Sequence, residues 1–258
     1  MTRTALITGA AGGIGRAVAA RLLADGWQVA GLDLAGAGPD GVGMHHADAT
    51  DPAQVRAAVA AALGRLGHLD ALVTCAGLTE GAPLHETTDE QWHHVLDANL
   101  TSVFLCVREV LPAMLAAGTG TVVTIGSVLH RTAAPGLPAY AAAKGAIAAL
   151  TRQLAVDYGH RGLTFLTLAP GWVRTPATEA RLGARADQDL ARLRESNPLR
   201  TVADAAQVAD AVALALSPAA ALLTGSELVL DAGARLVSPA SLLRDAHRER
   251  LGLPPLDA

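Results

Sequence analysis

The chain has 258 residues, and its 51% hydrophobic and 17% charged residues exclude an intrinsically disordered protein. A net charge of −4 without any cluster of Lys and Arg argues against a nucleic-acid partner. No apolar run approaches the roughly 20 residues that span a bilayer, and the N-terminus lacks leader features, so we expect a soluble, cytoplasmic protein. Cys75 and Cys106 are expected to be buried thiols rather than disulfide or zinc ligands.

Short apolar segments alternate with longer helical patterns, which is typical of βαβ units that form a parallel sheet. Seven strands are predicted, over residues 4–8, 28–33, 44–47, 70–74, 121–127, 163–168 and 227–231. Helices are predicted between them, over residues 13–25, 52–66, 89–117, 139–159 and 203–216. The sequence therefore predicts an α/β fold, a single-domain doubly wound parallel sheet with helices on both faces.

Three segments depart from this alternation. Residues 34–43 contain too much Gly and Pro for a helix, so we expect a loop there. Residues 175–200 are charged and helix-forming and contain two prolines, which predicts a lid over the substrate. We expect residues 1–237 to form the catalytic domain and residues 238–258 to form a tail that is disordered or docks on a neighbouring subunit.

A glycine-rich turn follows the first strand. It reads Thr8-Gly9-Ala10-Ala11-Gly12-Gly13-Ile14-Gly15 and leads directly into the first helix. Glycines permit tight turns and close approach of phosphates, while the N–H groups and the positive end of the helix dipole face negative charge. The order of strand, turn and helix predicts a dinucleotide site on a Rossmann-like domain, although the turn alone is also compatible with a plain turn.

Asp33 ends the second strand, 18 residues after Gly15. A carboxylate there accepts hydrogen bonds from the adenosine ribose hydroxyls, and it repels a 2′-phosphate that neither Leu34 nor Ala35 offsets with a cation. This favours NAD over NADP; the alternative is a turn aspartate. Asp48 ends the third strand and is expected at the adenine pocket, whereas Asp51 is expected to cap the next helix.

Ser127 ends an apolar strand, and Tyr140 and Lys144 follow on a helix, where positions i and i+4 share one face. Lys144 is the only lysine, in a chain that otherwise uses arginine. A nearby ammonium favours the phenolate, which can act as a general base at neutral pH. We therefore expect Tyr140 to exchange a proton with an alcohol whose oxygen Ser127 binds. The alternatives, an exposed serine, a packed tyrosine and a solvated lysine, are each ordinary when taken alone.

These motifs together match a known family. Over residues 3–236 the chain resembles the short-chain dehydrogenases/reductases, through the glycine turn, Asp48 before a Thr-Asp pair, Asn99 in Ala-Asn-Leu, Ser127, Tyr140-x-x-x-Lys144, Pro170-Gly171-x-Val173-x-Thr175 and Asp231-Ala232-Gly233. The resemblance implies a catalytic tetrad of Asn99, Ser127, Tyr140 and Lys144 and a homotetramer joined partly through the Tyr140 helix. It implies cofactor contacts from Gly9, Gly13, Ile14, Gly15, Asp33, Asp48, Ala49, Ala76, Gly77, Tyr140, Lys144, Pro170, Gly171, Val173 and Thr175.

Two features concern substrate and variation within the family. The family's Asn-Asn-Ala-Gly appears here as Thr74-Cys75-Ala76-Gly77, so the usual asparagine brace is absent. The short loop after Asp33 resembles that of dihydrodiol dehydrogenases, which is a weak indication of a cyclic alcohol or dihydrodiol substrate. The expected substrate contacts are Ser127, Leu129, His130, Tyr140 and Trp172.

The leading hypothesis is hydride transfer between NAD and a secondary alcohol or ketone. His130 is either a polar contact for the substrate or, the reading we favour, a surface histidine. No residue pattern has metal-ligand spacing, so no metal is expected. One alternative is a dinucleotide-sensing or scaffolding protein without turnover. Another is a sugar-nucleotide epimerase or dehydratase, which normally needs a larger C-terminal substrate domain than this chain has.

Overall fold

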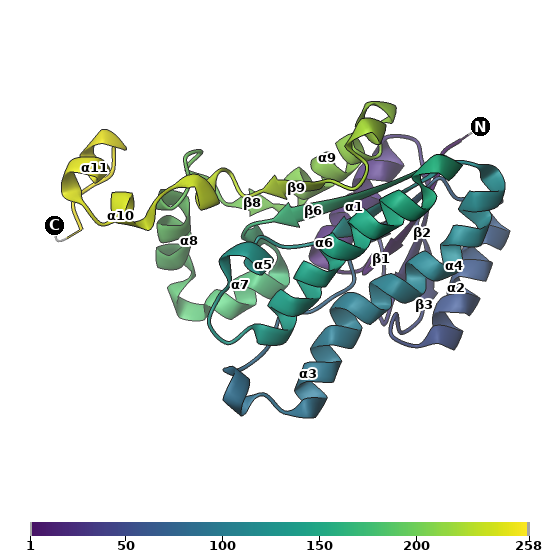
Figure 1. Ribbon diagram of the computed structural model, residues 1–258, viewed down its shortest axis with the longest axis horizontal. Coiled ribbons are helices and arrows are strands. Elements are labelled where there is room, and N and C mark those ends of the chain that lie inside the picture. The colour runs from purple at the N-terminus through teal and green to yellow at the C-terminus, as the bar shows by residue number, and fades with distance from the viewer. Residues whose placement is uncertain (1, 257–258) are drawn as a thin grey trace.

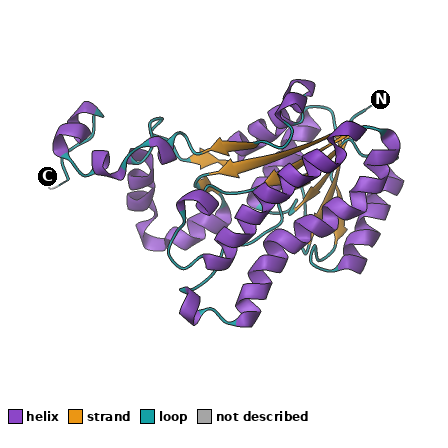
Figure 2. Cartoon of the chain, in the orientation of Figure 1, coloured by secondary structure: helices purple, strands orange, loops and turns teal. Residues whose placement is uncertain are grey.

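The computed structural model describes residues 2–256. At its centre is a seven-stranded sheet with the strand order β3-β2-β1-β4-β5-β6-β9. From β1 the chain adds strands first on one side of the sheet and then, from β4 onward, on the other side. All its strand pairs are parallel. The strands are β1 Thr4–Thr8, β2 Gln28–Asp33, β3 Gly43–His46, β4 Ala71–Thr74, β5 Gly120–Ile125, β6 Leu163–Pro170 and β9 Glu227–Leu230. The predicted seven-stranded parallel sheet is confirmed (Figure 2).

Helices cover both faces of this sheet, as predicted (Figure 1). Successive side chains of a strand point to opposite faces, so β1 contributes Leu6 to one core and Ala5 and Ile7 to the other. The Leu6 core is closed by α2 Pro52–Leu66, α4 Ser102–Ala117 and α6 Pro138–Tyr158. The opposite core is closed by α1 Gly13–Ala24 and α9 Ala205–Ala215. Burial on both faces explains why the strands are almost uniformly apolar.

The predicted helix over residues 89–117 is interrupted. It consists of α3 Asp89–Leu96, a π-helical turn over Asp97–Thr101 and α4. By length and composition this run is long and apolar enough to cross a membrane, contrary to the sequence analysis. However, its residues Val103, Leu105, Cys106 and Val110 are buried against the sheet, as in the core helix of a soluble protein.

The loop predicted after Asp33 is confirmed, since no helix occurs between β2 and β3. The lid segment is also helical, with α7 Pro176–Leu182 and α8 Ala186–Glu195. Thr175 begins α7 by accepting a hydrogen bond from Thr178 N. The two ends of the lid are joined by a small parallel sheet of β7 Val173–Arg174 and β8 Ala203–Asp204. Two-residue strands give no periodicity, so the sequence did not predict this pairing.

Of the two alternatives for the C-terminal tail, a disordered segment or one docked on a neighbouring subunit, the described residues do not show the first, because they are helical. The tail forms α10 Pro239–Leu242 and α11 Asp245–Arg250, which extend beyond α8 at one end of the molecule (Figure 1). Arg248 is only 4% exposed and contacts Glu195 Oε2 at 3.1 Å. Arg200 donates a hydrogen bond to the Leu251 carbonyl. These contacts tie the tail to the end of the lid within the same chain.

Candidate active site

The predicted site residues come from the carboxyl ends of neighbouring strands. Gly9 follows β1, Asp33 ends β2, Ala76 follows β4, Ser127 follows β5 and Pro170 ends β6. The carboxyl ends of parallel strands meet at one edge of a sheet, and ligands bind there at the point where strand order reverses. That point lies between β1 and β4.

The glycine turn forms a cradle that side chains would fill. Gly9 has a φ of +65°, and a Cβ on Gly15 would lie 2.1 Å from the Gly9 carbonyl oxygen. Gly12, at the start of α1, provides no side-chain cap. The first N–H groups of α1 therefore remain available to a ligand, where the positive end of the helix dipole lies. These features fit a dinucleotide pyrophosphate.

Asp33 closes the turn from the side. Its Oδ2 accepts a hydrogen bond from Ala11 N at 2.9 Å, so the carboxylate is held against the glycine turn. Leu34 is 69% exposed and carries no charge. Arg16, in the first turn of α1, is the nearby cation, and its guanidinium donates to the Ala37 carbonyl on the loop after β2. The position of this carboxylate fits a hydrogen bond from an adenosine ribose hydroxyl.

The third strand leads to an aspartate with local hydrogen bonds. Asp48 Oδ1 accepts from both the N–H and the hydroxyl of Thr50, at 2.8 and 2.7 Å. The adjacent Ala49 is 8% exposed. Asp51 accepts from Ala53 N and Gln54 N at the start of α2, which confirms the predicted helix cap. Asp48 thereby shapes the turn into α2, and this turn borders the proposed adenine side of the site.

Tyr140 and Lys144 lie on α6, one turn apart. Lys144 is 6% exposed, and its Nζ lies 5.5 Å from the centroid of the Tyr140 ring. Nζ donates a hydrogen bond to the Ile125 carbonyl at 3.0 Å, which anchors the ammonium to the end of β5. Ser127, 6% exposed, lies two residues beyond that strand. The structure thus brings α6 and the end of β5 together around these three side chains.

Burial changes the protonation of the lysine. The pKa of Lys144 falls from its ordinary value of 10.5 to about 8, because burial disfavours the ammonium; the nearby Cys75 has a smaller, opposite effect. A pKa in this range allows the group to gain and lose protons near neutral pH. The solvated lysine considered as an alternative is therefore not what the structure shows.

Asn99 lies in the π-helical turn, a feature that often marks functional sites. Its Nδ2 donates to the Leu78 and Val95 carbonyls, both at 2.9 Å. Its Oδ1 is buried and has no hydrogen-bond partner among the described residues. Gly77 leaves room for it, since a Cβ there would lie 2.6 Å from Oδ1 and 3.8 Å from Lys144 Nζ. A free buried acceptor beside the lysine is suited to hold a water molecule.

Comparison with known proteins agrees with this geometry. A family model described as enoyl-(acyl carrier protein) reductase matches residues 9–235. The chain belongs to the short-chain dehydrogenase/reductase family. It is therefore an oxidoreductase that transfers hydride between a nicotinamide dinucleotide and a secondary alcohol or ketone.

Several relatives match nearly their whole length. The 2-(R)-hydroxypropyl-CoM dehydrogenase of Xanthobacter autotrophicus is 40% identical, with 90% of this chain and 98% of that protein covered. The cis-4-hydroxycyclohexanecarboxylate dehydrogenase of Sinomonas cyclohexanicum is 37% identical, with 90% and 96% covered. A solved structure of an actinorhodin polyketide ketoreductase variant with NADPH is 29% identical, with a TM-score of 0.82 and 90% and 97% covered.

The family's Asn-Asn-Ala-Gly is replaced here, and no side chain of the described residues is shown to take over the asparagine brace; Thr74 Oγ1 is buried without a hydrogen-bond partner. Ala76 N donates to Thr8 Oγ1 at 3.1 Å, which links the chain beyond β4 to the end of β1. Cys75 is half-buried, and burial raises the pKa of its thiol to about 12. This dehydrogenase/reductase therefore keeps Cys75 as a neutral thiol beside Lys144.

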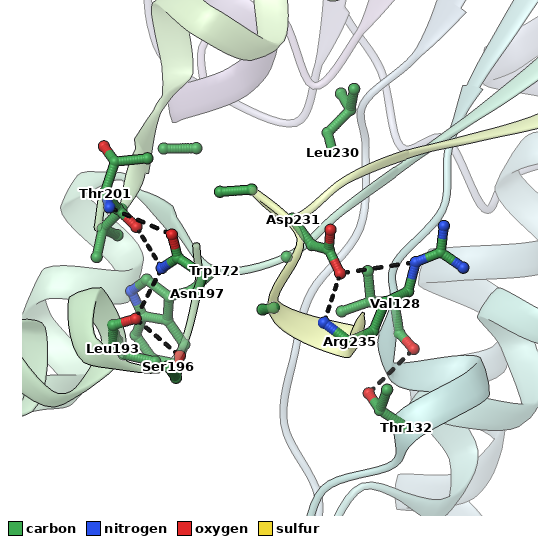
Figure 3. A pocket seen from close by; sticks show the side chains of 15 residues that line it. Val128, Thr132, Trp172, Leu193, Ser196, Asn197, Thr201, Leu230, Asp231 and Arg235 are labelled. Atoms are coloured by element: carbon green, nitrogen blue, oxygen red, sulfur yellow. Dashed lines mark hydrogen bonds and ion pairs between the residues drawn. The ribbon is translucent and has the colours of Figure 1, made fainter. Parts of the chain in front are cut away.

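One cavity of about 270 Å³ lies between the lid and the loop after β9 (Figure 3). Of the predicted substrate residues only Trp172 lines it, next to Val128; Ser127, Leu129, His130 and Tyr140 do not. Its polar lining residues, none of them predicted individually as a substrate contact, are Thr132, Ser196, Asn197, Thr201, Asp231 and Arg235. Asn197 lies within the predicted lid, but no motif singled it out. Asp231 was assigned only to the family pattern.

His130 is not the surface histidine that we favoured. Its side chain is 11% exposed, because the ring packs between two elements. Nδ1 lies 2.5 Å from the Ser127 carbonyl oxygen, and Nε2 lies 3.2 Å from Glu227 Oε1. Glu227 also pairs with Arg131, which is 96 residues away in the sequence. Only the tertiary fold therefore brings His130, Arg131 and Glu227 together.

Proposed function

We propose that this chain is an NAD-dependent dehydrogenase/reductase in which Asn99, Ser127, Tyr140 and Lys144 perform the proton chemistry. The observation that carries the proposal is the buried Lys144 ammonium, 5.5 Å from the Tyr140 ring and fixed to the Ile125 carbonyl. A cation held beside a phenol favours the phenolate. Tyr140 is then the group that takes the proton of a substrate hydroxyl, and in the reverse direction returns it.

The other two side chains have separate roles: Ser127 orients the substrate, and Asn99 takes part in the transfer of protons to solvent. The hydroxyl of Ser127 donates a hydrogen bond to the substrate oxygen, a contact that strengthens as negative charge develops there. Asn99 holds a water with its free Oδ1, and this water connects Lys144 to solvent. Protons that Tyr140 receives leave by this path, with Lys144 as the intermediate carrier.

The proposed cofactor contacts follow the cradle. Bound dinucleotide supplies the hydride acceptor for oxidation and the hydride donor for reduction. The turn residues Gly9, Gly13, Ile14 and Gly15 receive the pyrophosphate, and Thr175, at the base of the lid, borders the nicotinamide end. A Cβ on Gly13 would lie 2.7 Å from Thr175 side-chain atoms, so the turn and the lid base are in direct contact. The remaining contacts are assigned to Asp33, Asp48, Ala49, Ala76, Gly77, Tyr140, Lys144, Pro170, Gly171 and Val173.

NAD rather than NADP is proposed from the charge at Asp33. A 2′-phosphate placed on the ribose would face this carboxylate, which is already held by Ala11 N. Arg16 is the nearby cation that would have to compensate, and its guanidinium is bonded to the Ala37 carbonyl instead. The actinorhodin polyketide ketoreductase structure contains NADPH, so the proposed preference differs from the cofactor bound in that relative.

For the substrate we propose a secondary alcohol or ketone with an apolar body, such as a cyclic alcohol or dihydrodiol. The two relatives act on a hydroxypropyl and a hydroxycyclohexane group, both secondary alcohols by their names. The cavity beside Val128 and Trp172 offers mainly apolar surface, with Asn197 and Arg235 as polar groups. Ser127, Leu129, His130 and Tyr140 were expected to touch the substrate; of these we retain the catalytic pair, Ser127 and Tyr140.

We further propose one catalytic domain over residues 1–237, a lid over residues 175–200, a tail over residues 238–258, and a cytoplasmic homotetramer without a nucleic-acid or membrane partner. The exposed side of α6 carries small residues, Ala142 and Ala149. On α4, Phe104 is 47% exposed, and Val156 on α6 is 76% exposed. An apolar helix pair of this kind is suited to pack against a second copy.

The test is NADH and NADPH formation, followed by absorbance, across a panel of cyclic and acyclic secondary alcohols and diols. Wild-type protein is expected to form NADH, and Tyr140→Phe to lose about 10²-fold or more of this activity. Tyr158→Phe is the matched control, since Tyr158 packs against Phe165 away from the site. Binding of NAD without turnover on the whole panel would instead favour a dinucleotide-sensing protein.

A further inference from the structure

A cluster of charged and titratable side chains lies next to Ser127, with two largely buried members and one that is half-exposed. It consists of His130 and Arg131, on the short helix α5 Leu129–Thr132, and Glu227, the first residue of β9. The Glu227 side chain is 6% exposed. Arg131 donates to its Oε2 through Nε at 3.0 Å and through Nη2 at 2.5 Å. The catalytic mechanism above does not use any of these three side chains.

The histidine ring joins this carboxylate to the catalytic loop. A carbonyl oxygen can only accept, so Nδ1 must carry a proton to bond to the Ser127 carbonyl, 2.5 Å away. On its other side the ring faces Glu227 Oε1, which is buried and has no other partner among the described residues. With Nδ1 protonated, Nε2 of the neutral ring accepts from Arg131 Nε at 3.2 Å, and it would donate to Glu227 Oε1 only in the imidazolium. In the neutral ring Glu227 therefore orients the imidazole through Arg131, which it binds. The ring is therefore held on one side by charged groups and presents a donor to residue 127 on the other.

The carboxylate in turn is fixed by the sheet. Glu227 pairs in register with Thr167 of β6, so its backbone belongs to the rigid parallel sheet. The loop that His130 contacts is also bonded to β6, since Gly126 N donates to the Leu168 carbonyl and Val128 N donates to the Pro170 carbonyl. Ser127 Oγ accepts from Leu129 N at 3.2 Å. Among the described residues, the Ser127 carbonyl itself has the His130 ring as its partner, so His130 restrains the part of the peptide that β6 does not.

We propose that His130 is a positioning residue, which holds the Ser127 loop through Nδ1 and is itself oriented by Glu227. This inference rests on the proposed function only in that Ser127 binds the substrate oxygen. Because a hydrogen bond to that oxygen loses effect when the donor is displaced by a fraction of an ångström, the bridge acts on kcat rather than on cofactor affinity.

The first test compares three substitutions. In His130→Asn the side-chain amide nitrogen lies near the position of Nδ1, and in His130→Gln it lies near the position of Nε2. His130→Leu supplies no nitrogen at either position. We expect His130→Leu and His130→Gln to lower kcat by about 10- to 100-fold with KM for NAD unchanged, and His130→Asn to recover to within about threefold of wild type. His160→Leu, on an exposed histidine, is the matched control. Equal losses for all three variants would overturn the proposal.

A double-mutant cycle separates positioning from general destabilisation. In a Ser127→Ala background, His130→Leu is expected to change kcat by less than about twofold, because the group that it positions is gone. The same loss in both backgrounds would show that His130 acts on something other than Ser127. Glu227→Gln, which keeps the volume, is expected to reproduce part of the His130→Leu effect.

A measurement without turnover keeps the inference separate from the proposed function. The ¹⁵N signals of the imidazole in histidine-labelled wild type, assigned by comparison with His130→Gln, report which nitrogen carries a proton. A protonated Nδ1 supports the bridge, and an unprotonated Nδ1 overturns it whether or not any variant folds. If no alcohol on the panel is oxidised but Nδ1 is protonated, the proposed function fails and the bridge to Ser127 stands.

Discussion

The carboxylate of Asp33 accepts a hydrogen bond from the backbone N–H of Ala11, at 2.9 Å. The end of β2 and the glycine turn therefore form one continuous surface, with a negative charge placed where a ribose would lie. The charge is buried only in part, so a ligand can reach it. The proposed preference for NAD rests on this hydrogen-bonded position of the Asp33 carboxylate.

Removal of that charge should change the cofactor preference. Asp33→Ser is expected to raise KM for NAD by about 10-fold or more, the equivalent of one or two hydrogen bonds to a charged group, and to lower KM for NADP. Steady-state kinetics with both cofactors measure the ratio. Asp40→Ser, on an exposed position of the same loop, is the control. An unchanged ratio would show that Asp33 is only a turn residue.

Lys144 gives a direct test of pH dependence, because it is the only lysine in the chain. Selective ¹⁵N-lysine labelling should yield one side-chain signal, which we expect to titrate near pH 8 rather than at the ordinary 10.5. In alcohol oxidation the substrate proton passes to Tyr140 and onward to Lys144, so Lys144 must be able to accept a proton, which it does increasingly as pH rises through its lowered pKa. Alcohol oxidation should therefore rise as pH increases toward 8. A signal titrating at the ordinary value would contradict the burial effect.

The same shift has a consequence for stability. Because the folded-state pKa of Lys144 is lowered, the unfolded chain binds more protons between about pH 8 and 10.5, and the free energy of unfolding should increase with pH through that window. In Lys144→Met this contribution should vanish, together with catalysis. Denaturant unfolding of both proteins at several pH values measures it. An equal pH dependence in wild type and variant would assign the effect to other groups.

Gly15 is expected to tolerate no side chain. In Gly15→Ala the new Cβ would lie 2.1 Å from the Gly9 carbonyl oxygen, so the turn must open and the cradle for the pyrophosphate is lost. Cofactor affinity, measured by calorimetry, should fall by at least about 100-fold. Gly64→Ala in α2 is the matched control: no atom lies within 4 Å of its Cβ, and the change should stabilise the helix by up to about 1 kcal/mol.

Both thiols should be inert in the folded protein. Burial raises the pKa of Cys75 and of Cys106 to about 12, and the thiolate is the reactive form. A thiol reagent near pH 8 is expected to find no reactive cysteine in native protein and both of them in denaturant. Rapid reaction of one thiol in native protein would mean that the chain beyond β4 opens readily.

Local patterns were sufficient for much of this protein. The seven strands and five main helices were predicted because apolar periodicity and turn residues are properties of adjacent positions. The glycine turn and the Tyr140–Lys144 pair were recognisable for the same reason: each acts through residues that are close in the chain. Asp33 and Ser127 followed, since the carboxyl ends of parallel strands meet at one edge.

Contacts between distant residues were decided only by the tertiary structure. Pairing of β7 with β8, burial of Arg248 against Glu195 and the approach of Glu227 to His130 join residues that are 30, 53 and 97 positions apart, respectively. None has a periodicity or motif, because such contacts depend on how packed elements align rather than on neighbouring positions. The sequence by itself therefore determined the fold and the family and indicated the candidate reacting groups. Packing determined which side chains line the cavity and which ring contacts the Ser127 carbonyl.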